Sequence, residues 1–124
     1  METSQQFGTD FAQEFVDARR HPRFKMEVDL RVYPRNASVV RGNTVDISES
    51  GLSAMLLAEL NVGEVVRLEF ALPAGDVAVH ALVRHRTAFR YGLQFLDSTT
   101  SQDVIGRTCS ELRMEESLRA AKLP

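Results

Sequence analysis

Apolar and polar side chains alternate along the middle of the chain, from Phe24 to Phe95. The alternation is plain near its start, where Val28, Leu30 and Val32 are separated by single charged residues. A period of two predicts strands with one buried face. We expect six strands, around 28–32 and over 39–46, 51–57, 65–72, 77–86 and 90–96, with turn candidates at 41–43, 61–63 and 73–76. So many short strands in a small chain favour a closed antiparallel barrel, because closure leaves no exposed sheet edge.

The period becomes helical near the end of the chain. Ile105, Cys109 and Leu112 lie on one stripe of a predicted C-terminal helix. Thr99 and Gln102 have the spacing of a capping box at the start of that helix.

The residues before the first strand are expected to form a segment of their own outside the barrel. Over 9–16 a short helix is expected, with Phe11 and Phe15 four positions apart on one face. Pro22 then disfavours helical geometry in the residue before it. The arginine-rich segment 18–23 is therefore expected to be a flexible arm that leads into the first strand.

Composition narrows the class of protein. A chain of 124 residues with 44% hydrophobic and 26% charged residues suits one globular domain. We find neither an apolar run of roughly 20 residues nor a signal peptide, so we expect a cytoplasmic protein that does not insert into membranes. A single cysteine, Cys109, excludes an internal disulfide and a cysteine-based metal cluster. The net charge of −2 disfavours binding to a nucleic-acid polymer, which needs a broad basic face.

Two short motifs carry the candidate chemistry. Arg19 and Arg23 form R-x-x-x-R, and residues 46–51 read D-x-S-x-x-G. An arginine can bond the O6 and N7 edge of guanine with two hydrogen bonds, or neutralise a phosphate. A carboxylate such as that of Asp46 can accept hydrogen bonds from the N1–H and amine of guanine.

The serine and glycine of the second motif have a role in the same hypothesis. Ser48, two positions after Asp46 on an extended strand, would face the same way and bond the base or a phosphate. Gly51 would let the backbone turn sharply and approach a ligand closely. Each motif alone is also typical of ordinary structure, namely a solvated arm and a turn. Their joint presence around a strand-rich segment favours a nucleotide site.

In order and spacing, the two motifs resemble the signature of the PilZ domain, a bacterial module that binds the second messenger cyclic di-GMP. The resemblance continues in the strand over 90–95, where a glycine is followed by an aromatic residue, and in the C-terminal helix. It covers about residues 18–116, so 1–17 is expected to be an N-terminal extension and 117–124 a C-terminal tail. The resemblance implies a PilZ-like six-stranded antiparallel β-barrel with a C-terminal α-helix.

The resemblance also implies a function. We expect a noncatalytic receptor that needs no cofactor, clamps cyclic di-GMP between the arginine arm and the barrel, and signals to a separate protein in motility or biofilm regulation. The expected ligand-binding residues are Arg19, Arg20, Arg23, Asp46, Ser48 and Gly51. Arg20 lies in the spacer and has two interpretations, a phosphate contact or a solvated side chain. Ala18 stands where many family members have another arginine, which favours one ligand per site over a stacked pair.

His85 or Arg86 could stack on an exposed guanine, and the sequence does not choose between them. Both are also ordinary residues for a strand surface. An enzyme is disfavoured because the chain has neither a G-x-S-x-G nucleophile motif nor a phosphate-binding glycine loop with lysine. The alternative to a receptor is a protein-interaction module of the same fold that does not bind nucleotide.

Overall fold

The computed structural model of the chain describes residues 21–96 and 100–122. Arg19, Arg20 and Thr99 lie outside the described residues, as does the helix expected over 9–16. The predictions that concern them therefore remain predictions.

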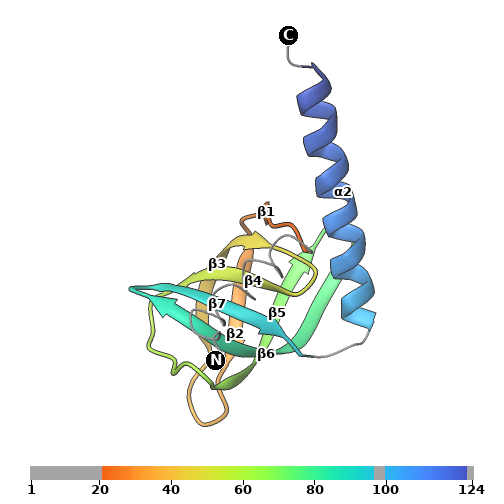
Figure 1. Ribbon diagram of the computed structural model, residues 1–124. Helices are drawn as coiled ribbons and strands as arrows, with labels where there is room; N and C mark the ends of the chain where they lie inside the picture. The colour runs from red at the N-terminus through yellow and green to blue at the C-terminus, as the bar shows by residue number, and fades with distance from the viewer. Residues whose placement is uncertain (1–20, 97–99, 123–124) are drawn as a thin grey trace, which may run out of the picture.

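Short strands make up most of the described chain, and one long helix follows them (Figure 1). The elements are β1 (Phe24–Lys25), β2 (Asp29–Tyr33), β3 (Val40–Ile47), β4 (Gly51–Leu56), β5 (Val65–Leu72), β6 (Gly75–Thr87), β7 (Arg90–Phe95) and α2 (Thr100–Lys122). Six of the strands match the six that alternation predicts. The exception is β1, which has only two residues and is too short to show a period.

The sheet closes on itself. Its order is β1-β3-β2-β5-β6-β7-β4, and an additional pairing of β3 with β4 joins the two ends. A closed barrel of six antiparallel strands results, with β1 outside it and paired to the end of β3. The prediction of a six-stranded antiparallel barrel is confirmed.

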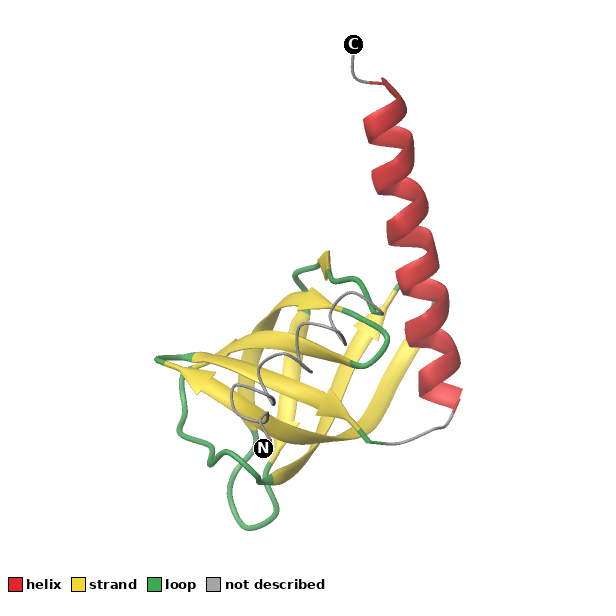
Figure 2. Cartoon of the chain, viewed as in Figure 1, coloured by secondary structure: helices red, strands yellow, loops and turns green. Residues whose placement is uncertain are grey.

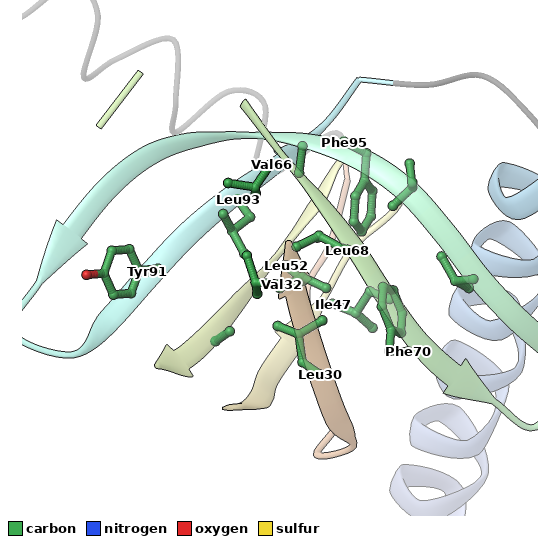
Figure 3. Close-up of a cluster of buried hydrophobic side chains, with 14 of the residues drawn as sticks. Leu30, Val32, Ile47, Leu52, Val66, Leu68, Phe70, Tyr91, Leu93 and Phe95 are labelled. Carbon is green, nitrogen blue, oxygen red and sulfur yellow. The ribbon is translucent and has the colours of Figure 1, made fainter. Parts of the chain in front are cut away.

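Apolar side chains from every barrel strand fill the interior (Figure 3). In β2, for example, Leu30 and Val32 are buried while Asp29 and Arg31 are exposed. On β4 and β7 the outward positions Gly51, Ser53 and Gly92 are buried as well. Groups outside the core therefore cover these three positions, whereas Met55 and Arg90 on the same outer face are exposed.

One turn prediction was wrong. Residues 41–43 lie inside β3, where Gly42 pairs with Leu30 on one side and Leu56 on the other. A Cβ at Gly42 would lie 2.3 Å from the backbone oxygen of Met55, so this glycine permits close strand packing. The turn over 61–63 is present, and Gly63 has the left-handed φ of 96° that favours glycine there. A turn also joins β5 to β6 where it was expected.

The helix α2 packs against β6 and β1 through its first half only. Ile105 and Cys109 are buried and Leu112 is half-buried, as the predicted stripe requires. Every side chain over 113–121 is exposed, and the helix projects beyond the barrel (Figures 1 and 2). Because α2 continues to Lys122, most of the segment expected to be a tail is helical. No helix among the described residues is long and apolar enough to cross a membrane.

Candidate functional site

A single row of residues crosses the outer face of four strands. Asp46 on β3 pairs with Ser53 on β4, Ser53 pairs with Gly92 on β7, and Gly92 pairs with His85 on β6. Residues that are directly opposite in neighbouring antiparallel strands share a face. The row therefore brings the aspartate of the D-x-S-x-x-G motif and a predicted stacking residue to one surface.

Two β-bulges flank this row and determine which side chains it contains. The register shifts between Thr44 and Asp46 in β3, and between Val83 and His85 in β6. Thr44 and Val83 are buried in the barrel, so strict alternation would turn Asp46 and His85 inward too. One extra residue in each strand reverses the phase and turns both side chains outward.

Arg23 lies beside the aspartate end of the row because β1 pairs with the end of β3. Its Nη1 donates to Oδ1 of Asp46 at 3.0 Å and to Oγ of Ser53 at 3.3 Å. Arg90 approaches the other carboxylate oxygen of Asp46, with Nη2 at 3.4 Å from Oδ2. The Asp46 side chain is only 15% exposed, and a guanidinium lies against each of its oxygens. Arg23 also helps to explain why Ser53 is buried.

A pocket of about 270 Å³ lies next to these ion pairs. Four of its lining side chains, His21, Arg23, Arg84 and His85, carry or can carry positive charge, and none of the described residues that line it is acidic. The complete lining is His21, Arg23, Ser48, Ser50, Gly51, Arg84, His85, Gly92, Leu93 and Gln94. The second arginine of R-x-x-x-R thus meets the serine and glycine of D-x-S-x-x-G, which are more than twenty residues later in the sequence. Such a surface suits a compact anion.

Ser48 lies in the turn after β3 rather than on the strand, because β3 ends at Ile47. Its Oγ accepts hydrogen bonds from the backbone amides of Ser50 and Gly51, each at 3.2 Å. This is the turn chemistry that the motif can also encode. The side chain of Ser48 is buried yet reaches the pocket wall, so its ligand contact remains a prediction.

Gly51 begins β4 and serves close strand packing rather than a sharp turn. A Cβ there would lie 2.2 Å from the backbone oxygen of Leu93 in β7. The expected close approach therefore exists, but it is to a neighbouring strand. Gly51 still forms part of the pocket wall.

The structure separates the two stacking candidates. The ring of His85 lies over Gly92, since a Cβ at Gly92 would have three atoms of that ring as its nearest neighbours, at 2.2–2.8 Å. Arg86 instead pairs with Tyr91, with Cζ 5.5 Å from the ring centroid, and its Nη2 lies 3.6 Å from Oε2 of Glu59. Only His85 of the two lines the pocket.

Sequence reasoning missed several residues of this site. His21, Arg84 and Gln94 line the pocket, and Arg90 contacts Asp46. Alternation along β7 carried a usable signal, because Arg90 and Gln94 share the outer face with Gly92. No sequence pattern of this kind indicated that His21 belongs to the site, because its position depends on the path of the chain before β1.

Within residues 21–96 and 100–122, no three histidine, cysteine, aspartate or glutamate side chains are grouped so that they could hold a metal ion.

The described fold is that of several solved structures. The PilZ domain of YcgR from Escherichia coli, determined with c-di-GMP, is 21% identical with a TM-score of 0.66, and the match covers 85% of this chain and 98% of that one. The PilZ domain of CeSA from a cellulose-synthesizing bacterium is 18% identical with a TM-score of 0.61, over 73% and 97% of the two chains. MotI, the inhibitor of motility from Bacillus subtilis, is 19% identical with a TM-score of 0.68, over 78% of this chain but only 52% of its own.

The TM-scores establish a shared fold. No curated protein matches the chain. The family model of the PilZ domain matches residues 17–111, which include both sequence motifs, all seven strands and the barrel-facing half of α2. The chain therefore belongs to the PilZ domain family.

Proposed function

We propose that this protein is a noncatalytic receptor for cyclic di-GMP. The observation that carries the proposal is the cationic pocket, in which Arg23 meets Ser48 and Gly51 beside the carboxylate of Asp46. Two structures with the same fold, the PilZ domain and the longer chain of YcgR from Escherichia coli, were determined with c-di-GMP. The ligand is a cyclic dinucleotide with two phosphates, whose negative charge suits a site lined by arginine and histidine.

Arg23 and Asp46 would act as a pair. The carboxylate holds the guanidinium at the rim of the pocket, so that little side-chain freedom is lost when a ligand binds. Arg23 then donates to a phosphate or to the O6 and N7 edge of guanine, while Asp46 accepts from the guanine N1–H and amine. Arg19 and Arg20 would join from the arm that precedes Arg23.

The pocket volume suits one base better than a complete dinucleotide. At about 270 Å³ it lies near the lower end of small-molecule sites. We propose that one guanine stacks on the ring of His85 while the phosphates extend toward the arginines. This arrangement favours one ligand per site.

The route to a partner protein would run through α2. Nε2 of Gln102 donates to the backbone oxygen of Glu49 at 2.8 Å, within the D-x-S-x-x-G turn. The same helix packs against β1, which directly follows Arg23. A ligand that draws Arg23 and the turn together would therefore shift two of the contacts of α2 and alter the surface offered to a partner. We place this signalling in the cytoplasm, in motility or biofilm regulation.

Isothermal titration calorimetry with cyclic di-GMP tests the receptor. We expect saturable binding near one ligand per chain, weakened about 10- to 100-fold by Arg23→Ala and by Asp46→Ala, because a hydrogen bond to a charged group contributes about 1.5–3 kcal/mol. Arg41→Ala is the matched control, since Arg41 is exposed on β3 and lies outside the pocket. A folded wild-type protein that does not bind would refute the proposal.

One observation favours the alternative, an interaction module without nucleotide. Met114 and Leu118 on the projecting half of α2 are 65% and 56% exposed, four positions apart on one face. This second function would be supported if the folded protein does not bind cyclic di-GMP and if Leu118→Ser abolishes its binding to a partner protein.

A further inference from the structure

Arg84 stands out among the pocket residues because it occupies the bulge of β6. Its neighbours Val83 and His85 pair with Leu93 and Gly92, and Arg84 is the extra residue between them. Bulges of this kind re-aim side chains and are frequent beside functional sites. Arg84 is exposed and lines the pocket, although it belongs to neither sequence motif.

Gln94 orients this arginine. Nη1 of Arg84 donates a hydrogen bond to Oε1 of Gln94, and both side chains form part of the pocket wall. Gln94 is fixed in turn by β7, where it pairs with Gly51 and Leu82. A guanidinium held by a neighbour loses less rotamer freedom when it meets a ligand than a mobile one does.

Arg84 and Arg23 approach the pocket from opposite ends of the row. Arg23 lies over Asp46 and Ser53, on β3 and β4, whereas Arg84 precedes His85 on β6. With strands about 4.8 Å apart, β4 and β6 lie on the order of 10 Å from each other across β7. Two arginines at that spacing can contact opposite sides of a ligand with two phosphates.

We propose that Arg84 is a further ligand-binding residue, which donates to a phosphate of cyclic di-GMP, and that Gln94 is its positioning residue. The inference rests on the receptor function proposed above. It adds an arginine from the barrel wall to those supplied by the arm.

Calorimetry on Arg84→Ala tests the contact. We expect cyclic di-GMP to bind about 10- to 100-fold more weakly, and the dependence of Kd on NaCl concentration to become shallower, because a screened charge contact is lost. Arg41→Ala removes the same charge outside the pocket and should change Kd less than about twofold. Circular dichroism and thermal unfolding confirm that each variant is folded, and Arg84→Met provides a second neutral variant with a long side chain.

A double-mutant cycle tests the role of Gln94. Gln94→Leu keeps the size of the side chain but removes the acceptor, so we expect about a two- to fivefold loss of affinity in the wild type and none in the Arg84→Ala background. Equal losses in both backgrounds would refute the positioning role. If the wild-type protein binds cyclic di-GMP and Arg84→Ala binds it no more weakly than Arg41→Ala does, the Arg84 contact alone is overturned. Absence of wild-type binding would overturn it together with the receptor function.

Discussion

The ring of His85 lies against the Cα of Gly92, and Gly92→Ala tests what that contact does. A Cβ at this position would lie 2.2 Å from Cε1, 2.3 Å from Nε2 and 2.8 Å from Nδ1 of His85. These three are its nearest neighbours, and an ordinary contact lies at 3.4–4 Å. The imidazole must therefore move by more than about 1 Å, while β7 can keep its register.

The magnitude follows from the mobility of that ring. His85 is exposed, so it can leave its position at a cost of about 0.5–1.5 kcal/mol for a strained or changed rotamer. If a guanine stacks on the ring, the displaced imidazole also removes a contact of about 1–3 kcal/mol, which weakens binding by about 5- to 150-fold. The variant should thus lose more affinity than stability.

Urea unfolding and calorimetry with cyclic di-GMP, applied to Gly92→Ala, His85→Ala and the double variant, measure both effects. In the His85→Ala background no ring remains to be displaced. Gly92→Ala should therefore change neither the free energy of unfolding nor the free energy of binding by more than about 0.5 kcal/mol. If Gly92→Ala destabilises both backgrounds equally, the added methyl group clashes with something other than the ring. The reasoning would then be refuted.

Two further substitutions and one thiol reaction test the fold. Gly51→Ala should lower the free energy of unfolding by about 1–3 kcal/mol or more, since its Cβ would lie 2.2 Å from the backbone oxygen of Leu93; an unchanged urea midpoint would contradict this. Ala88→Gly should raise the same free energy by about 0.5–1 kcal/mol because Ala88 holds a φ of 57°, and a lower thermal midpoint would argue against strain there. Burial raises the pKa of the Cys109 thiol from 9.0 to about 11, so the stability linked to the neutral thiol is complete below pH 9 and is lost as the pH rises toward 11. At pH 8 an aromatic disulfide reagent should react slowly with native protein and fully in urea, and equal rates would contradict the burial.

Alternation predicted most of the fold because the barrel buries one face of each strand. It located six strands to within a few residues and identified the helix through Ile105, Cys109 and Leu112. It failed where local composition and tertiary contacts disagree. Gly42 resembles a turn residue, yet it lies within β3 because only glycine fits against the backbone of Met55.

The site was less predictable than the fold. The motifs identified Arg23, Ser48 and Gly51, which do meet in one pocket, but the sequence could not show that Asp46 contacts both Arg23 and Arg90. Those contacts depend on how β1 and β7 are placed relative to Asp46 on β3. That placement follows from the strand register, which no local sequence pattern encodes. For the same reason, the sequence could not show that His85 lines the pocket and that Arg86 does not.

The two bulges explain how one sequence satisfies both the core and the site. Without the extra residue in β3, Asp46 would follow Thr44 into the barrel and Ile47 would turn to solvent, although Ile47 is fully buried. An ionised carboxylate enclosed there without partners would cost several kcal/mol. Asp46 and Ile47 can therefore occupy their favourable faces together only if the strand changes phase just before them.

The same argument applies to β6. Val77, Val79, Ala81 and Val83 are buried at alternate positions, and His85 would be the next inward residue. The change of phase at Arg84 turns His85 toward the pocket and leaves Arg86 on the face of Tyr91. A polar residue that interrupts a regular apolar alternation thus marks the place where the barrel departs from ideal geometry. Both bulges flank the row that forms the candidate site.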